Sequence, residues 1–264
     1  MDSIVTCSRD ARNELITIEC EALTGGRPDV RGIARGRVDR VHQGAFVKLG
    51  VQLLAQAPGL EQLVSRVADL ALQQDEFRIE WLATGGYEGS RWDATIAIAD
   101  QIDGNPNLVD PGHRYLLLAG AGEMSFGRVA AQASRDYRKH DGKPCHTPSS
   151  LPAQLARCLV NLVAHHAQTI ADPCCGTGSI LLEAASLGLS AQGGDLNPRM
   201  VAMSRQNVDA FGYQTRIDCV DARTWKATAD AVVTDLPYGR GLEVAERSLR
   251  EIISQALEMA PMAI

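Results

Sequence analysis

The sequence predicts an α/β protein, with a doubly wound, mostly parallel sheet in its second half and an α+β region before it. Two observations predict this arrangement. Short apolar strands alternate with amphipathic helices after residue 152, a pattern typical of a parallel sheet. A polar and basic stretch over 134–144 separates this half from an earlier series of strands and helices. We therefore predict two domains, 1–143 and 144–264.

The first half contains a strand–helix–strand–strand–helix–strand series. Its elements are a strand over 3–7, a helix over 10–23, a loosely alternating strand over 30–40, a strand over 46–54, a helix over 60–72 and a strand over 77–82. Leu15, Ile18 and Ala22 recur at helical spacing, whereas residues 77–82 alternate with period two. This order is a ferredoxin-like plan. A helix over 92–102 and strands over 114–119 and 124–130 follow it.

The second half contains strands that alternate with helices. The strands are predicted over 169–171, up to Asp195, over 216–220 and over 231–234, and the helices from Pro152, after Gly178, over 198–211 and over 243–259. Leu155, Leu159 and Leu162 give the first of these helices its apolar face. The chain reaches residue 264 where a fifth strand would begin, so we expect the sheet to be truncated after its fourth strand.

Composition excludes several classes of protein. The formal net charge is −6 and the isoelectric point about 5.5, so any binding of nucleic acid must use local patches. The seven cysteines are odd in number and form no C-x-x-C pair. The sequence shows neither a charged leader with an apolar core nor an apolar run of about eighteen residues. It predicts a cytoplasmic protein with free thiols and no membrane span.

The second half is organised around the segment 169–185. An apolar strand ends in Asp172, passes through Pro-Cys-Cys-Gly-Thr-Gly and continues as an Ala-rich helix. Gly176 and Gly178 carry no Cβ atom, so the backbone of this turn can approach a ligand closely. The turn is not the G-x-G-x-x-G loop of nicotinamide oxidoreductases, and its acidic opening favours a ligand with a positive group. S-adenosyl-L-methionine, with its amino group and sulfonium, meets that requirement.

Four aspartates close predicted strands at the edge where open α/β sheets bind ligands, and they are Asp172, Asp195, Asp221 and Asp235. The first, with its turn, would hold the methionine end of the cofactor. The second would accept hydrogen bonds from the ribose hydroxyls, the third would bind the adenine amino group and the fourth would face the substrate. The alternative is that these acids only begin loops and cap helices.

The segment Asp235-Leu-Pro-Tyr238 carries the chemistry in this interpretation. The exocyclic amine of a base is a poor nucleophile, because its lone pair is delocalised into the ring. The Asp235 carboxylate and the Leu236 carbonyl would each accept one N–H and direct the nitrogen toward a methyl sulfonium. Pro237 stiffens the turn, and Tyr238 offers a face on which an extruded base can stack. The alternative is an ordinary proline turn after a strand.

These motifs resemble those of a known family. Residues 172–178 and 235–238 together are similar to amino-group methyltransferases with a D/N-P-P-Y tetrad, which have a Rossmann-like sheet. Residues 148–162 resemble the segment before the cofactor loop in the THUMP-domain tRNA guanosine N2-methyltransferases, in the archaeal and eukaryotic branch that modifies position 10. Residues 103–111 resemble a THUMP segment, so 1–143 is expected to be a ferredoxin-like plus shortened THUMP-like RNA-binding region. Leu236 stands where the family commonly has Pro.

The resemblance implies a role for each matching residue. The catalytic residues would be Asp235, Leu236, Pro237 and Tyr238. The cofactor-binding residues would be Asp172, Cys174, Gly176, Thr177, Gly178, Asp195, Leu196, Asp221, Ala222, Ser149 and Ser150. No metal is expected, because the spacing of Cys174-Cys175 and His165-His166 does not suit zinc.

The expected partner is RNA, tRNA in particular, bound through two local basic patches. The first patch comprises Arg27, Arg31, Arg35, Arg37 and Arg40, and the second comprises Arg128, Arg135, Arg138, Lys139 and Lys143. The sequence thus predicts an S-adenosylmethionine-dependent RNA methyltransferase acting on an exocyclic amine, guanine N2 in tRNA. Two alternatives stay open: N6-adenine methylation of DNA or RNA, and a non-catalytic RNA-binding protein with a degenerate methyltransferase half.

Overall fold

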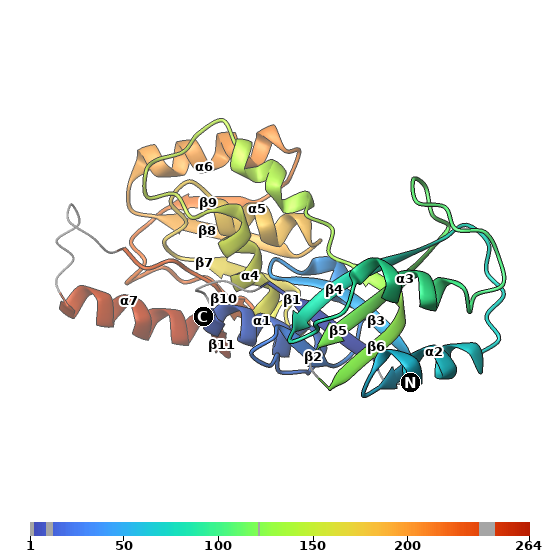
Figure 1. The fold of residues 1–264 in the computed structure, drawn as a ribbon. Helices are drawn as coiled ribbons and strands as arrows, with labels where there is room; N and C mark the ends of the chain where they lie inside the picture. The colour runs from blue at the N-terminus through green and yellow to red at the C-terminus, as the bar shows by residue number, and fades with distance from the viewer. Residues whose placement is uncertain (1–2, 9–12, 121, 238–245) are drawn as a thin grey trace. The chain divides into compact units, whose positions relative to one another are not determined.

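The computed structural model describes residues 3–8, 13–120, 122–237 and 246–264 (Figure 1). The chain divides into two compact units, Met1–His42 with Val47–Ala133 and Gln43–Phe46 with Ser134–Ile264. This division falls earlier than the boundary that we predicted between residues 143 and 144. The reason is that the 3-10 helix η2 (Asp136–Gly142) belongs to the second unit, where its His140 side chain is buried against Glu183.

The first unit contains a sheet of six strands in the order β2-β1-β3-β6-β5-β4 (Figure 1). The strands are β1 (Ser3–Cys7), β2 (Ile33–Arg35), β3 (Val47–Ala57), β4 (Phe77–Gly85), β5 (His113–Gly120) and β6 (Glu123–Gln132). The helices are α1 (Asn13–Thr24), α2 (Leu60–Ala68) and α3 (Arg91–Ala99), and the 3-10 turn η1 spans Val41–Gln43. Neighbouring strands are antiparallel except β4 and β5, which α3 connects as a parallel pair.

The elements of the first unit follow the predicted order, but their pairing corrects the ferredoxin-like expectation. β5 and β6 form a hairpin that lies between β3 and β4 in the sheet. The strands of residues 3–82 therefore do not form a four-stranded sheet of their own, as a ferredoxin-like plan requires. Leu116, Leu117 and Leu118 are all buried, which is the pattern of a central strand covered on both faces. The strand expected over 30–40 is only the three-residue β2, because the chain then turns into η1. The THUMP-like assignment stays a prediction.

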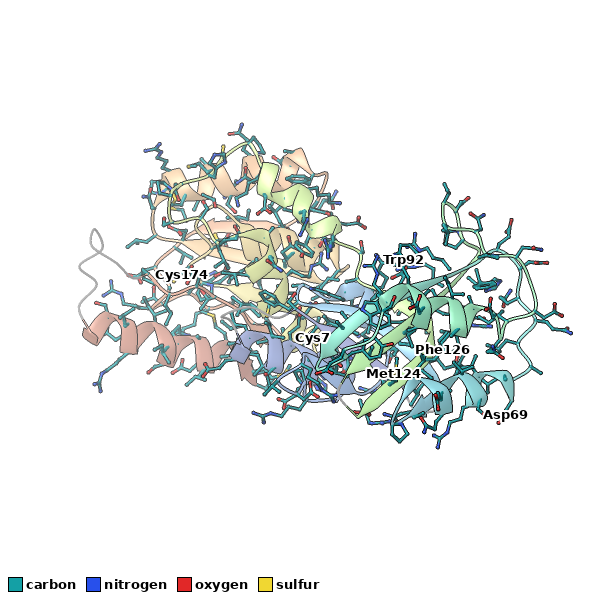
Figure 2. The ribbon with its side chains drawn as sticks, in the orientation of Figure 1. Cys7, Asp69, Trp92, Met124, Phe126 and Cys174 are labelled. Atoms are coloured by element: carbon teal, nitrogen blue, oxygen red, sulfur yellow. The ribbon has the colours of Figure 1, made fainter. Side chains whose placement is uncertain are left out.

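One face of this sheet packs against α2 and α3 through an aromatic cluster. The rings of Tyr115 and Phe126 are stacked with centroids 5.1 Å apart, and Phe77 meets Tyr115 edge-on at 6.3 Å. Figure 2 labels Met124 and Phe126, which extend from β6 into this cluster. The sheet of the first unit is therefore held by an apolar core of its own.

The second unit contains a parallel sheet with strand order β11-β10-β7-β8-β9, as the doubly wound prediction requires. The strands are β7 (Thr169–Asp172), β8 (Ser190–Asp195), β9 (Arg216–Cys219), β10 (Ala231–Val232) and β11 (Met262–Ala263). The helices are α4 (Ala153–Val163), α5 (Ser179–Ser186), α6 (Pro198–Ala210) and α7 (Glu246–Met259). The expected end of the sheet after its fourth strand is wrong, because β11 pairs with β10 as a fifth strand.

The two faces of the parallel sheet are covered by different helices. Ile170 and Ala231 pack with residues of α4, α5 and α6, whereas their neighbours Ala171 and Val232 pack with residues of α7. The chain runs from β7 through β8 to β9 on one side of β7, and β10 lies on its other side. The carboxyl ends of β7 and β10 therefore flank the topological switch point, where open α/β sheets bind their ligands. Among the described residues, no helix is long and apolar enough to cross a membrane.

Candidate active site

The loop after β7, which we call the glycine loop (residues 173–178), is shaped by two glycines with left-handed backbone. Gly176 has φ +51° and Gly178 has φ +82°, a conformation that favours glycine. A Cβ atom on Gly178 would lie 2.4 Å from the Ser204 hydroxyl oxygen, whereas a Cβ on Gly176 would meet nothing within 4 Å. The loop is therefore packed tightly against α6 at Gly178 and leaves open space beside Gly176.

The backbone N–H groups of the glycine loop are largely paired within the protein. Cys174 N–H donates to Asp172 at 3.2 Å and Cys175 N–H donates to the Gly194 carbonyl at 2.9 Å. Gly176 N–H donates to the Asp195 carboxylate at 2.9 Å. These bonds tie the loop to the ends of both β7 and β8, so its shape is set before any ligand is bound.

Asp172 connects the two loops at the switch point. Its side chain is buried, with 1% of its surface exposed, and one carboxyl oxygen accepts a hydrogen bond of 2.7 Å from the Thr234 hydroxyl. Burial raises the pKa of Asp172 to about 7, and the nearby charges of Asp195 and Asp235 act in the same direction. A carboxyl group in this position gains most from a cationic ligand, because a positive charge would favour its ionised form.

Asp195 and Asp221 lie at the ends of the next two strands. The Asp195 carboxylate also accepts a hydrogen bond of 2.8 Å from Asn197 N–H, and Leu196 beside it is 68% exposed. Val220 N–H donates to the Asp195 carbonyl at 3.0 Å, which brings the two strand ends together. Asp221 forms an ion pair of 2.5 Å with Arg223, and that guanidinium lowers the pKa of Asp221.

The residue before the tetrad, Thr234, contacts Asp172. Asp235 is partly buried and its burial raises the pKa of its carboxyl group. Leu236 and Pro237 are also partly buried, whereas Tyr238 lies outside the described residues. Val233 N–H donates to the Ala171 carbonyl at 3.0 Å, so the strand pairing continues up to the tetrad. The predicted cofactor loop therefore follows β7, and the predicted substrate loop follows β10, the strand that pairs with β7.

The remaining predicted residues lie in the segment before α4, in the glycine loop and after β9. The Ser150 and Thr177 hydroxyls are 2.9 Å apart, and the Ser149 hydroxyl, which is exposed, is 3.1 Å from that of Thr147. Ala222 is buried beside Asp221. Except for Ser149, each predicted site residue that the structure describes follows one of four parallel strands or contacts the glycine loop, and the functional roles stay predictions.

Sequence reasoning missed two residues that bind these loops together. Thr234 bridges to Asp172, and Asn207 of α6 donates a hydrogen bond of 2.8 Å to the Thr177 carbonyl. The spacing of Ser204 and Asn207, three residues apart on a helix, places two polar side chains on one face. Both are fully buried. Two polar residues on the otherwise apolar face of α6 could therefore have been recognised in the sequence as partners of a neighbouring loop.

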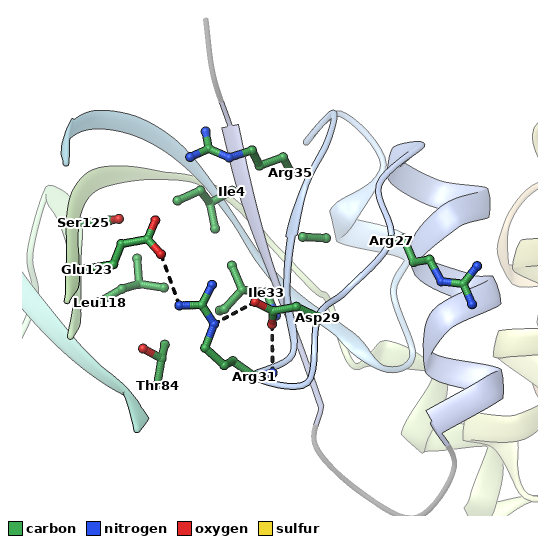
Figure 3. Close-up of a pocket in the computed structure, with 11 residues that line it drawn as sticks. Ile4, Arg27, Asp29, Arg31, Ile33, Arg35, Thr84, Leu118, Glu123 and Ser125 are labelled. Carbon is green, nitrogen blue, oxygen red and sulfur yellow. Dashed lines mark hydrogen bonds and ion pairs between the residues drawn. The ribbon is translucent and has the colours of Figure 1, made fainter. Parts of the chain in front are cut away.

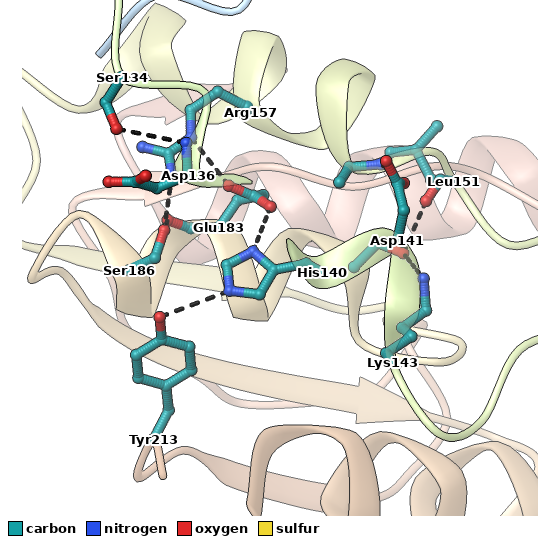
Figure 4. A network of polar contacts seen from close by, with 12 residues as sticks. Ser134, Asp136, His140, Asp141, Lys143, Leu151, Arg157, Glu183, Ser186 and Tyr213 are labelled. Carbon is teal, nitrogen blue, oxygen red and sulfur yellow. Dashed lines mark hydrogen bonds and ion pairs between the residues drawn. The ribbon is translucent and has the colours of Figure 1, made fainter. Parts of the chain in front are cut away.

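A buried polar network fixes the segment before α4 to the rest of the second unit (Figure 4). Glu183 is fully buried and accepts from Arg157 at 2.8 Å and from the His140 ring at 2.6 Å. Lys143 is also buried and donates to the Ser179 hydroxyl at 3.0 Å. Lys143 was expected in the second basic patch. That expectation is wrong, because its ammonium group is enclosed and paired within the protein.

The two adjacent cysteines of the glycine loop are not activated. Burial, with the nearby charge of Asp172, raises the pKa of Cys174 to about 12, and burial likewise raises the pKa of Cys175. Both thiols are therefore protonated near neutral pH, which makes them poor nucleophiles and poor metal ligands. In the part of the chain that the structure describes, no group of three His, Cys, Asp or Glu side chains could hold a metal ion.

A cavity of about 350 Å³ lies in the first unit (Figure 3). The residues that line it include the apolar Ile4, Ile33 and Leu118 and the basic Arg27, Arg31 and Arg35. Arg31 forms ion pairs with Asp29 at 2.7 Å and with Glu123 at 3.2 Å. Its lining comes from the first unit alone, so this cavity is not the predicted cofactor site.

The parallel sheet, with its acidic strand ends and its glycine loop, gives the second unit a Rossmann-like architecture. Residues 135–262 match the family described as RMKL-like, methyltransferase domain. The chain is also similar in sequence to several archaeal tRNA methyltransferases.

Two of these relatives are archaeal tRNA (guanine(10)-N2)-dimethyltransferases. The chain is 37% identical over 123 residues to that of Methanothermobacter thermautotrophicus, a match that covers 45% of this chain and 36% of the relative. It is 29% identical over 188 residues to that of Methanocaldococcus jannaschii, covering 64% and 52%. The chain thus spans between a third and about half of the length of these relatives.

A solved structure is similar over nearly the whole chain. The crystal structure of TrmN from Thermus thermophilus matches with a TM-score of 0.52 and 20% identity, covering 99% of this chain and 86% of that chain. At this identity the similarity shows the fold.

Proposed function

We propose that the chain is an S-adenosylmethionine-dependent RNA methyltransferase that acts on an exocyclic base amine, guanine N2 in tRNA. The observation that carries this proposal is the Thr234–Asp172 hydrogen bond of 2.7 Å, which joins the residue before Asp235 to the residue before the glycine loop. A methyl donor held by one loop and an amine held by the other would lie next to each other across the switch point. The archaeal relatives, whose names state this reaction, support the same substrate.

The residues around the glycine loop fit the proposed cofactor. The buried Asp172 carboxyl suits the amino group of a methionine moiety. The space beside Gly176, which a Cβ atom would partly fill, leaves room for the cofactor to approach the backbone. Ser150 and Asp195 offer further oxygen atoms nearby, while Leu196 and Ala222 would flank the nucleoside. When bound, the cofactor would supply a methyl group on a positively charged sulfur atom. Asp221 would serve the adenine amino group only by sharing its carboxylate with Arg223.

The tetrad would orient the amine. Asp235 would accept one N–H of the amine and the Leu236 carbonyl the other, so that the nitrogen lone pair faces the cofactor loop. Pro237 restricts the turn that presents this carbonyl. Tyr238 is proposed as a stacking surface for the base. Positioning of the two reactants would supply much of the rate acceleration, and Asp235, whose pKa burial raises, would accept the departing proton directly or through water.

We propose that RNA contacts the basic side chains that remain exposed in the two patches. In the first unit Arg27, Arg35, Arg37 and Arg128 are exposed, and the first two line the cavity described above. The second unit contributes Arg135, Arg138 and Lys139, while Lys143 is withdrawn from this role. Cytoplasmic tRNA is the substrate that this proposal implies, so we place the protein in the cytoplasm.

The decisive experiment incubates the protein with total tRNA and methyl-labelled cofactor and then digests the RNA to nucleosides. Label in N2-methylated guanosine is expected. Label in N6-methyladenosine would refute the substrate and favour the adenine alternative. Absence of labelled nucleoside together with absence of cofactor binding in isothermal titration would favour a non-catalytic RNA-binding protein.

A further inference from the structure

Asn207 has every polar atom of its side chain engaged although it faces no predicted ligand. It lies on α6 and is fully buried. Its carbonyl oxygen accepts a hydrogen bond of 2.7 Å from Cys145 N–H, and its amide group donates to the Cys145 carbonyl at 2.6 Å and to the Thr177 carbonyl at 2.8 Å. One side chain thereby joins α6 to two separate segments of backbone.

Both of these segments lead to the proposed methionine site. Thr177 lies in the glycine loop, and its hydroxyl contacts that of Ser150 at 2.9 Å. Cys145 begins the short stretch that ends at Ser150, where Thr147 N–H donates to the Ser150 hydroxyl at 2.8 Å. A continuous network of hydrogen bonds therefore links α6, the 145–150 segment and the glycine loop, and it runs through Asn207, Cys145, Ser150 and Thr177.

The same face of α6 also restricts the next residue of the loop. A Cβ atom at Gly178 would lie 2.4 Å from the hydroxyl oxygen of Ser204, one helical turn before Asn207. The helix thus fixes the glycine loop at two consecutive positions, through a hydrogen bond at Thr177 and through close contact at Gly178. Neither contact involves the adenosine side of the site, which lies at the ends of β8 and β9.

We propose that Asn207 is a positioning residue that sets the glycine loop and the 145–150 segment for the methionine end of the cofactor. This inference rests on the proposed function. A primary amide is required because the three backbone groups need one acceptor and two donors from a single planar side chain. A carboxylate would confront two carbonyl oxygens without a proton to donate, so aspartate cannot replace asparagine although it has the same shape.

The test compares two ligands that differ only at the methionine end. S-adenosylhomocysteine carries the amino acid portion, whereas 5′-methylthioadenosine lacks it. In the Asn207→Asp variant of the full chain, isothermal titration should show affinity for S-adenosylhomocysteine reduced by roughly tenfold or more. Affinity for 5′-methylthioadenosine should stay within about twofold of the unmodified protein, because the adenosine contacts lie on other strands.

The matched control is Asp209→Asn, the reverse exchange at an exposed position of the same helix, which should leave both affinities unchanged. If Asn207→Asp does not fold, Asn207→Ser introduces no charge and its short side chain cannot span both segments. An equal loss of affinity for both ligands would indicate a structural role and would overturn the inference. Unchanged affinity for both ligands would overturn it as well. An unmodified protein that binds neither ligand would instead overturn the proposed function and the inference together.

Discussion

The two loops at the switch point follow neighbouring strands but are built in different ways. The glycine loop after β7 is bound to Asp172, Gly194 and Asp195 by its own N–H groups and rests on α6. The tetrad loop after β10 is linked to this neighbourhood through the Thr234 hydroxyl. Within the described part of the chain, the structure shows no hydrogen bond or ion pair of the Asp235 carboxylate.

The described part of the glycine loop is therefore held by more hydrogen bonds within the protein than the described part of the tetrad loop. A cofactor loop with paired N–H groups loses little conformational freedom on binding, which favours affinity. The partly buried Asp235 carboxylate has no partner among the described residues, and the N–H group of a bound amine would supply one. The comparison predicts that changes in the glycine loop act on cofactor affinity and changes in the tetrad act on methyl transfer.

The largest effect is expected at Asp235. Asp235→Ala should lower the rate of methyl transfer by roughly 100-fold or more, because the amine loses its orienting acceptor and its proton acceptor. Affinity for S-adenosylmethionine should change by no more than a few-fold, as titration would measure. A large loss of cofactor affinity would show that Asp235 belongs to the cofactor site and not to the substrate site.

A second effect concerns the carboxyl group that joins the loops. Asp172→Asn should weaken S-adenosylmethionine binding by roughly 30-fold or more, because a buried charge partner of the cofactor amino group is lost. In the unmodified protein, affinity should rise with pH between about 6 and 8, since ionisation of Asp172 near its raised pKa creates that partner. A pH-independent affinity would contradict this role.

The same substitution should stabilise the ligand-free protein at alkaline pH. The folded-state pKa of Asp172, about 7, lies above the ordinary value of 3.8, so the folded state holds this proton more tightly than the unfolded state. The stability associated with Asp172 is therefore complete below pH 3.8 and declines as pH rises to about 7. Thermal unfolding at pH 8 should give a higher Tm for Asp172→Asn, with the gain shrinking toward pH 4.

A pair of glycine substitutions sharpens the comparison within the loop. Gly176→Ala places a methyl group in the open space beside the loop and should reduce cofactor affinity by roughly tenfold. Gly188→Ala is the matched control, because Gly188 also has a positive φ of +79° and open space around it but follows the opposite end of α5. Both should lose a similar 1–2 kcal/mol or so of stability. Equal effects on affinity would refute a cofactor at Gly176.

The smallest effect is expected at the two serines before α4. Ser150→Ala removes a hydroxyl in contact with Thr177 and should weaken cofactor binding roughly fivefold, the equivalent of about 1 kcal/mol. Ser149 is exposed, so Ser149→Ala should change affinity by less than about twofold. Titration of both variants would rank the serines, and a larger effect at Ser149 would reverse their assigned order.

Local pattern in the sequence determined where the chain changes from strand to loop in the second unit. Asp172 follows the apolar run 169–171, and turn chemistry marks Gly176 and Gly178 as positions for left-handed backbone. Period-two and helical spacing are short-range signals, so the order of elements could be predicted in both units. The end of the parallel sheet could not, because β11 comprises only two residues.

Tertiary structure alone decided which of these elements meet. Thr234 and Asp172 are 62 residues apart, and their contact exists because β10 pairs with β7 on the side away from β8. The burial of Lys143 and the three hydrogen bonds of Asn207 likewise depend on distant segments. In the first unit, the β5–β6 hairpin lies between β3 and β4 for the same reason. Which strands pair depends on the surfaces that distant segments bury against each other, and the local periodicity of a sequence does not contain this information.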